Sequence, residues 1–183
     1  VTHASNVCGT VNNIDLIGKI CSDKNVPLLV DGAQSAGTLP INLDSFDIDF
    51  FACAGHKGLL GPQGTGLLYV KNKDLLSPSI AGGTGSLSDS AYQPDFMPDK
   101  FESGTPNIIG IAGLAEGCRY LLNHGVESIY EHDKKLLGIF LNELSGIRGI
   151  QLYGLETADN HTAVLSVNID GMDSSQLGTV LEE

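Results

Sequence analysis

The chain has 183 residues, a hydrophobic content of 42% and a formal net charge of -12 at pH 7. This length suits one domain, or one domain with part of another, and the apolar content is sufficient for a packed core. The acidic residues are spread along the chain and no basic block occurs, which argues against nucleic acid and anionic membrane as partners. No apolar run is long enough to span a membrane and the start has no signal-peptide pattern, so we expect a cytoplasmic protein.

The cysteines show neither a Cys-x-x-Cys pair nor a Cys/His ligand spacing; they are Cys8, Cys21, Cys53 and Cys118. We therefore expect no metal site, and we interpret the cysteines as reduced and mostly buried. The chain has no initiator methionine, and residues 174–183 read as a helix without a C-terminal cap. On this basis we expect it to be part of a longer protein.

The first 37 residues alternate between apolar segments and polar turns. Residues 1–10 read as the end of a strand followed by a turn that contains Asn6, and residues 13–25 have the apolar spacing of a helix. The run at 27–30 is typical of a buried parallel strand, and Asp31 follows it directly. Open α/β sheets bind ligands beside such strand ends. Two structural alternatives stay open, because Asp31 can cap the next helix and Asn6 can stabilise a turn.

A second apolar run, residues 48–54, predicts a buried strand that ends in Gly55-His56-Lys57. A glycine-rich loop and a third apolar run follow. Lysine forms Schiff bases, and partial burial lowers its pKa so that a reactive neutral amine becomes available. The glycines would let a cofactor phosphate approach the backbone closely. The alternative is a surface lysine in a turn, which is the common case for a lone lysine. A Walker A loop is excluded because the lysine precedes the glycines.

The second half of the chain begins with an exposed loop, residues 82–99, rich in Gly, Ser, Pro and Asp. Thr105 and Pro106 then have the chemistry of an N-cap and a first helical residue, and a helix N-terminus also suits a phosphate. We expect a helix from there to about His124, ended by Gly125, and a second helix over about 127–144. The runs 149–153 and 162–169 predict two further strands.

The lysine segment also carries a family resemblance. The sequence Ile48-Asp49-Phe50-Phe51, then Ala54-Gly55-His56-Lys57, then Gly64-Thr65-Gly66-Leu67 resembles the lysine signature of the class V aminotransferase family. These are fold-type I pyridoxal-phosphate (PLP) enzymes and include cysteine desulfurases and selenocysteine lyases. Two more segments are similar to family motifs: Asp31-Gly32-Ala33-Gln34, and Lys100-Phe101-Glu102-Ser103-Gly104-Thr105-Pro106, in which Lys100 replaces the usual arginine.

The resemblance spans essentially the whole chain, which would be about half of a full family member. It implies an α/β fold, the three-layer PLP-dependent transferase fold of type I. Residues 1–144 would be the C-terminal part of an incomplete PLP-binding large domain. Residues 145–183 would be the beginning of a small α+β C-terminal domain.

The resemblance also implies site residues. Lys57 would form the Schiff base with PLP, Asp31 would pair with the pyridine nitrogen, and Ala33 would lie against one face of the ring. The remaining cofactor contacts would be Asn6 and Gln34 at the ring oxygen, and His56 and Thr105 at the phosphate, with Thr105 reaching the phosphate of a partner subunit. One expected phosphate contact is missing, because Ala54 stands where the family often has a serine.

The implied activity is that of a homodimeric cysteine desulfurase, which removes sulfur from cysteine and leaves alanine and a persulfide, for transfer to a possible acceptor protein. The sulfur-accepting cysteine and the arginine that binds the substrate carboxylate are expected beyond Glu183, so we expect this chain alone to be inactive. Another class V enzyme (aminotransferase, selenocysteine lyase or isomerase) and a non-catalytic relative remain open alternatives.

Overall fold

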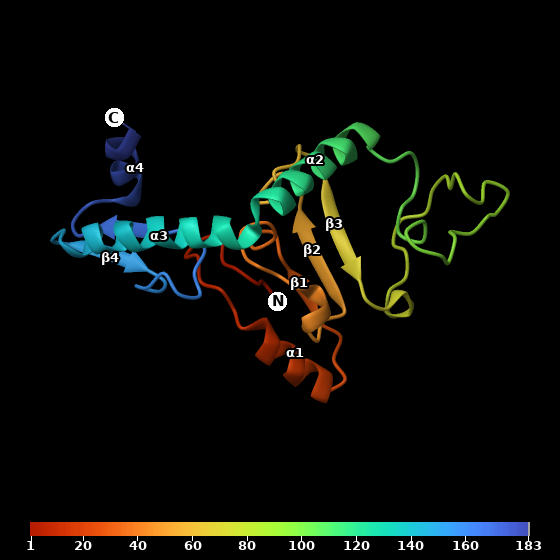
Figure 1. Ribbon diagram of the computed structural model, residues 1–183, viewed down its shortest axis with the longest axis horizontal. Coiled ribbons are helices and arrows are strands. Elements are labelled where there is room, and N and C mark those ends of the chain that lie inside the picture. The colour runs from red at the N-terminus through yellow and green to blue at the C-terminus, as the bar shows by residue number, and fades with distance from the viewer. Residues whose placement is uncertain (183) are drawn as a thin grey trace.

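The computed structural model describes residues 1–182 and arranges them around two β-sheets (Figure 1). The first sheet has the strand order β1 (Leu29–Asp31), β2 (Phe50–Ala54), β3 (Gly66–Val70), and the second pairs β4 (Ile150–Tyr153) with β5 (Ser166–Ile169). The helices are α1 (Ile14–Asp23), α2 (Ile108–His124), α3 (Val126–Ser145) and α4 (Ser174–Glu182). Two short 3-10 helices, η1 (Leu43–Ser45) and η2 (Lys73–Leu75), complete the set. The expected α/β class is confirmed.

The first sheet brings the ends of three parallel segments to one edge. β1 pairs in parallel with β2, with Asp31 opposite Ala52, whereas β2 and β3 form an antiparallel hairpin. The N-terminal segment adds to the other side of β1, because the His3 amide donates to the Asp31 carbonyl at 2.9 Å and a parallel bridge joins Thr2 to Asp31. Residues 1–4, β1 and β2 therefore all run in the same direction, and the loops that follow them emerge at the same edge.

A compact apolar cluster holds α1 against this sheet. Its buried members are Ile14, Leu28, Val30, Ile48 and Phe51. The helix begins where the Asn13 side chain accepts a hydrogen bond from the Leu16 amide at 3.0 Å, as a helix N-cap does. Burial of each such aliphatic or aromatic side chain contributes about 1.5–3 kcal/mol to the stability of the fold. The cluster thus fixes the strands whose ends carry the polar loops.

Gly32, directly after β1, is required for close packing on Phe51. A Cβ at position 32 would lie 1.9 Å from the Phe51 Cζ atom. We expect Gly32→Ala to lower the free energy of unfolding by about 1–3 kcal/mol, because the Phe51 ring must move within a packed core. Gly138→Ala, in the middle of α3 with no atom within 4 Å of the new Cβ, is the matched control and should gain about 0.5–1 kcal/mol. Urea unfolding of both variants measures the difference, and equal midpoints would contradict the packing argument.

The helix α2 begins two residues later than the sequence indicates. Its N-cap is Asn107, whose side chain accepts from the Gly110 amide at 3.0 Å, and Thr105 lies in the preceding loop. The expected end is confirmed, since Gly125 has a φ of +87° and separates α2 from α3. The glycine amide donates to the Leu121 carbonyl at 2.8 Å and closes the last turn.

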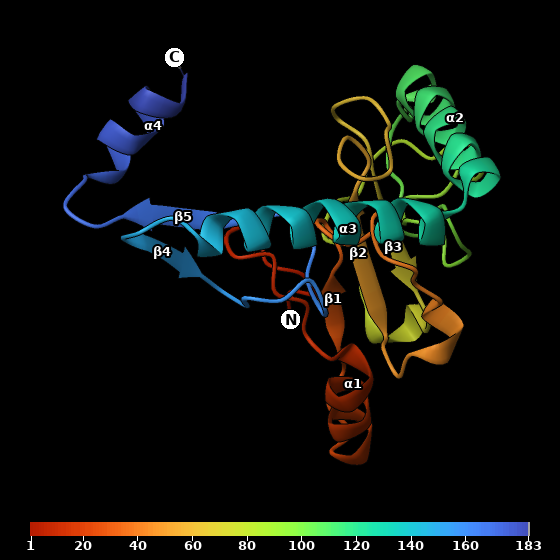
Figure 2. The same cartoon turned by 60° about the vertical axis from the view of Figure 1, so that its left-hand side comes forward.

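The helix α3 extends from the first sheet to the second, which lies alongside its C-terminal half (Figures 1 and 2). In the second sheet Ile150 is opposite Ile169 and Tyr153 is opposite Ser166. The expected strand at 162–169 is only half formed, because the Thr162 amide donates instead to the Gly9 carbonyl at 2.8 Å. The domain boundary at residue 144/145 stays a prediction.

Two further expectations concern the cysteines and membranes. All four cysteines are unpaired as expected, but each is half-buried and none is fully buried. Within residues 1–182 no helix combines the length and apolarity that crossing a bilayer requires.

Candidate active site

The candidate site is the sheet edge at which residues 1–4, β1 and β2 end. Asn6 follows the first segment, Asp31 is the last residue of β1, and His56 and Lys57 follow β2. Because β1 and β2 are adjacent and parallel, Asp31 and Lys57 leave neighbouring strands at the same edge. This is the position at which open α/β sheets bind ligands. The structure thus brings together three of the segments singled out in the sequence.

Asp31 is exposed, and its carboxylate Oδ1 accepts a hydrogen bond from the Ala33 amide at 2.9 Å. This contact is of the local capping type, and it fixes the carboxylate at the start of the turn. Ala33 and Gln34 are half-buried in the same turn, which the Thr38 hydroxyl closes by donating to the Gln34 carbonyl at 2.8 Å. Among residues 1–182 Asp31 forms no ion pair, so its charge is available to a ligand.

The lysine lies in a tight turn built from glycines. The Gly55 amide donates to the Thr65 carbonyl at 2.9 Å, the Gly61 amide to the Gly55 carbonyl at 2.7 Å, and the Leu60 amide to the Lys57 carbonyl at 2.9 Å. Leu60 has a φ of +58°, a left-handed conformation that is uncommon outside glycine. The backbone of the lysine turn is therefore tied down at both ends.

Two neighbours pack on this lysine turn. A Cβ on Gly58 would lie 2.4 Å from the Ala36 carbonyl oxygen, so the turn contacts the loop that follows Asp31. On α2, a Cβ on Gly117 would lie 2.4 Å from the Leu59 carbonyl oxygen, and one on Gly113 would lie 3.1 Å from Pro62. The glycine face of α2 was not recognised in the sequence. Its signal was the spacing of Gly110, Gly113 and Gly117 on one side of a helix.

The side chains of His56 and Lys57 are both exposed in this chain. The partial burial expected for Lys57 is therefore wrong for the described residues. Gly55 and Gly58 flank the His56-Lys57 pair without side chains, and no other segment within residues 1–182 buries the lysine side chain. No ion pair holds Lys57 within residues 1–182.

Asn6 lies at the tip of a short turn. The Ser5 amide donates to the Thr10 carbonyl at 3.0 Å, and the Ser5 hydroxyl accepts from the amides of Val7 at 3.1 Å and Cys8 at 3.2 Å. The Asn6 side chain is exposed. Ser5, and not Asn6, thus supplies the side-chain hydrogen bonds that stabilise this turn. The Asn6 amide group is left free to contact a ligand at the sheet edge.

The same turn gives Cys8 an acidic thiol. Hydrogen bonds from the Ser5 and Thr10 side chains lower the pKa of Cys8 from 9.0 to about 7, whereas burial raises the pKa of Cys53. We expect alkylation of Cys8 by iodoacetamide to rise with pH through about 7, because the thiolate is the nucleophile, and to be faster than that of Cys53. Ser5→Ala should move this midpoint upward, since it removes the first of these hydrogen bonds. Mass spectrometry of the alkylated peptides measures both rates, and equal rates at pH 7 would contradict the assignment.

Thr105 lies apart from this edge, in the long loop between η2 and α2. It lines a shallow cavity with residues 83–85, 104 and 106, and the Gly104 amide donates to the Gly83 carbonyl at 2.7 Å. Figure 1 shows this loop projecting away from the sheet. The structure therefore does not place Thr105 with Asp31 and Lys57 in one chain.

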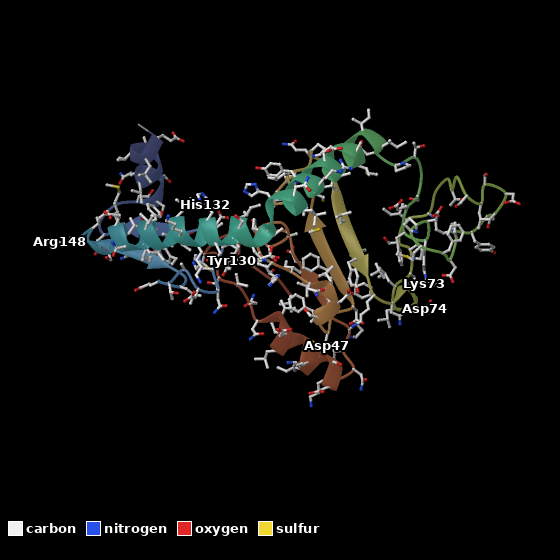
Figure 3. The ribbon with its side chains drawn as sticks, in the orientation of Figure 1. Asp47, Lys73, Asp74, Tyr130, His132 and Arg148 are labelled. Carbon is white, nitrogen blue, oxygen red and sulfur yellow. The ribbon has the colours of Figure 1, made fainter. Side chains whose placement is uncertain are left out.

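An ion-pair cluster holds the base of that loop. Asp95 lies 2.8 Å from the Lys73 ammonium and 3.0 Å from the Lys100 ammonium, and the two lysines lower its pKa to about 2, Lys73 being the first cause. Lys100 is buried and also donates to the Lys73 carbonyl at 2.9 Å. Lys73 lies beside Asp74 at the foot of the loop (Figure 3). Lys100, which stands where the related motif has arginine, thus anchors the loop.

No group of three or more His, Cys, Asp or Glu side chains within residues 1–182 is arranged to hold a metal ion. The groups at the sheet edge are instead the Lys57 amine, the Asp31 carboxylate, the His56 imidazole and the side-chain amides of Asn6 and Gln34. Such a set can bind a planar carbonyl compound with a basic ring nitrogen, because the amine can add to the carbonyl and the carboxylate can pair with a protonated ring.

Comparison with known proteins agrees with this chemistry. The family model described as "Aminotransferase class-V" matches residues 1–183, and the chain belongs to that family. Members of this family are in general PLP-dependent. The chain is 38% identical over 187 residues to a probable cysteine desulfurase of Methanothermobacter thermautotrophicus and 34% identical over 188 residues to one of Pyrococcus abyssi. It is covered completely in both cases but spans 46% of each relative, so the chain has about half the length of the curated relatives it matches.

The solved structures give the same result for the fold. An apo structure of cysteine desulfurase from Thermococcus onnurineus matches the whole chain with a TM-score of 0.86 at 33% identity, and the match covers 46% of that protein. The cysteine desulfurase CsdA of Escherichia coli matches 99% of the chain with a TM-score of 0.79 at 27% identity, over 45% of its own length. The expected fold of the PLP-dependent transferases of fold type I is therefore confirmed.

Proposed function

We propose that the intact protein is a PLP-dependent cysteine desulfurase in which Lys57 is the lysine that bonds to the cofactor. The observation that carries this proposal is the common edge of the parallel strands β1 and β2, where Asp31 ends β1 and Lys57 follows β2 by three residues. The motif Asp31-Gly32-Ala33-Gln34 and the lysine signature meet at that edge, and the relatives of similar sequence are named cysteine desulfurases.

Three features of the residues at this edge suit the binding of PLP. The Asp31 carboxylate is oriented by the Ala33 amide at 2.9 Å and has no ion-pair partner among residues 1–182, as a counter-charge for a protonated ring nitrogen requires. The glycines around Lys57 leave the backbone open to close approach. Ala33 is small enough to lie against an aromatic ring. These features support PLP as the cofactor.

We assign the remaining contacts as follows. Asn6 and Gln34 would donate to the ring oxygen, since both amides lie in loops at the same edge. His56, exposed beside Lys57, would donate to the phosphate. Thr105 would reach the phosphate bound to a second copy of the protein, which agrees with its position in a loop away from the edge of its own chain.

When bound, PLP supplies an electron sink for bonds at the substrate α-carbon. The chain's own groups then have defined tasks. Asp31 keeps a positive charge on the ring by pairing with it, and the Lys57 amine accepts and returns protons beside the substrate. The hydrogen bonds that the Gly55 amide donates to the Thr65 carbonyl and the Gly61 amide donates to the Gly55 carbonyl hold the lysine turn in place while the amine moves.

The proposed substrate is cysteine. The sulfur atom leaves the substrate β-carbon and bonds to the sulfur of an enzyme thiol, so that one cysteine and one thiol give one alanine and one persulfide. The balance needs no outside oxidant, because the β-carbon gains the electrons that the sulfur loses. We further propose a homodimer, a protein that accepts the sulfur, and a division into a PLP-binding large domain (1–144) and a small C-terminal domain (from 145).

The test is to incubate the intact protein with PLP and cysteine and to measure alanine, sulfide under reducing conditions, and keto acid. Equal molar release of alanine and sulfide is the expected result. Keto acid without sulfide would replace the desulfurase with an aminotransferase of the same family. Absence of both products, with no PLP absorbance on the protein, would identify a non-catalytic relative and overturn the proposal.

A further inference from the structure

The turn that carries Asn6 is held by a segment about 150 residues further along the chain. The Thr162 amide donates to the Gly9 carbonyl at 2.8 Å, the Val11 amide donates to the Asn160 carbonyl at 2.9 Å, and the Ser166 hydroxyl donates to the Val7 carbonyl at 2.5 Å. An antiparallel bridge also joins Thr10 to His161. Segment 160–166 leads directly into β5, so the second sheet and the Asn6 turn are connected by hydrogen bonds.

His161 is the buried centre of this contact. The residue is 1% exposed, and its Nδ1 lies 2.6 Å from the Thr162 carbonyl oxygen, a distance that requires Nδ1 to carry the proton. The ring therefore fixes the orientation of the peptide group next to it. Its Nε2 is buried and has no hydrogen-bond partner within the described chain, which is unusual for a residue placed only for stability.

Gly9 makes the close approach possible. It has a φ of +68°, and a Cβ at this position would lie 2.5 Å from His161 Cε1 and 2.3 Å from the Val164 carbonyl oxygen. The imidazole thus occupies the space that any side chain at position 9 would take. Since the chain before Asn6 is paired with β1 through His3, the turn is fixed from two sides, by the first sheet and by His161.

We propose that His161, acting through Gly9, is a positioning residue for Asn6, and that this contact transmits the placement of the second sheet to the cofactor edge. The proposal rests on the role of Asn6 at the cofactor ring given above. It predicts that disturbing the Gly9–His161 contact weakens cofactor binding although neither residue is assigned a contact with the cofactor.

The first test compares two glycines in the intact protein. Gly9→Ala introduces a Cβ into the His161 ring, whereas Gly171→Ala has a similar φ of +77° and no atom within 4 Å of its Cβ. Both substitutions place an alanine in the left-handed region, at a similar cost in backbone strain. Only Gly9→Ala also displaces the turn that carries Asn6. We expect the dissociation constant for PLP, from an absorbance titration, to rise at least tenfold in Gly9→Ala and less than twofold in Gly171→Ala. Equal effects of the two substitutions would overturn the proposal.

The second test asks whether the effect passes through Asn6. In a protein that already carries Asn6→Ala, adding Gly9→Ala should weaken PLP binding by less than twofold further. The reason is that the contact of Asn6 with the cofactor, which His161 and Gly9 position, is already absent. Fully additive losses would mean a general structural role and would overturn the proposal. A wild-type protein that does not bind PLP would instead contradict the proposed function, so the two failures are distinguishable.

Should Gly9→Ala fail to fold, His161→Asn and His161→Leu replace it. The asparagine amide can donate in place of Nδ1 and leucine cannot, so PLP affinity should be retained at least in part by His161→Asn and lost in His161→Leu. Hydrogen exchange gives a readout that does not depend on turnover: amides of residues 5–10 should exchange faster in His161→Leu than in His161→Asn. Equal affinity and equal exchange in the two variants would contradict a positioning role.

Discussion

Replacement of Lys57 by alanine in the intact protein is expected to abolish covalent attachment of PLP and to reduce turnover by roughly 10²–10⁴-fold or more. The reason is that Lys57 is the amine that follows β2 at the Asp31 edge, and its loss removes both the covalent bond and the group that moves protons. Absorbance spectra before and after borohydride reduction, with peptide mapping of the fixed cofactor, measure the attachment.

The matched control is Lys71→Ala. Lys71 is also exposed and also adjoins the first sheet, but it follows β3, and its amide donates to the Asp49 carbonyl at 2.9 Å, next to the start of β2. It therefore lies at the opposite end of the sheet. We expect attachment and turnover to be retained in Lys71→Ala. If the cofactor is still fixed to the protein in Lys57→Ala, another lysine is the attachment site and the assignment of the sheet edge is wrong.

Much of this edge could be predicted from local sequence. The runs at 27–30 and 48–54 are short and apolar, and the structure confirms both as strands, parallel to each other. Once two neighbouring strands are parallel, the residues that follow them meet at one edge without any further information. The sequence alone did not show that these two strands are neighbours, and it was the family resemblance that joined Asp31 and Lys57 in one site although 26 positions separate them in the chain.

The start of α2 and the start of β5 could not be predicted from local sequence. The first depends on which of two capping residues is used, and the second on a contact between residues far apart in the chain. Thr105 and Asn107 both have side chains that can cap a helix, and the structure uses Asn107, which accepts from the Gly110 amide at 3.0 Å. The run 162–169 is rich in β-branched residues, but the Thr162 amide pairs with Gly9 and the strand begins only at Ser166. Contacts between positions 9 and 162 leave no periodic pattern in the sequence, so local reading cannot find them.

The exposure of Lys57 has a similar origin. Sequence patterns report which residues prefer burial, whereas the burial of one ammonium group depends on which other side chains surround it. In the described chain the lysine turn packs with its backbone against the Ala36 carbonyl and α2, and the side chains of His56 and Lys57 remain exposed. The ligand edge is thus built from backbone contacts, which keep Lys57 in position without covering it.

Asp31→Asn separates a structural from a chemical role for the residue at the end of β1. The Asp31 Oδ1 atom accepts the Ala33 amide hydrogen at 2.9 Å, and an asparagine oxygen can accept the same bond. Asparagine and aspartate are about equal as caps, and the side chain is exposed, so we expect the free energy of unfolding to change by no more than about 0.5 kcal/mol.

Turnover should nevertheless fall by orders of magnitude, on the scale of the roughly 10²–10³-fold lost when one preorganised electrostatic partner is removed from an active site. Asparagine cannot supply the negative charge that keeps the ring nitrogen of PLP protonated, and an unprotonated ring is a poor electron sink. Asp44→Asn provides the control, because Asp44 is an exposed acidic residue in the first turn of η1, away from the sheet edge, and its replacement should leave turnover unchanged. Urea unfolding and initial rates of alanine formation, measured on the same preparations, give both quantities. Unchanged turnover in Asp31→Asn would mean that the carboxylate only caps the turn, and the assignment of the ring-nitrogen partner would then have to move to another residue.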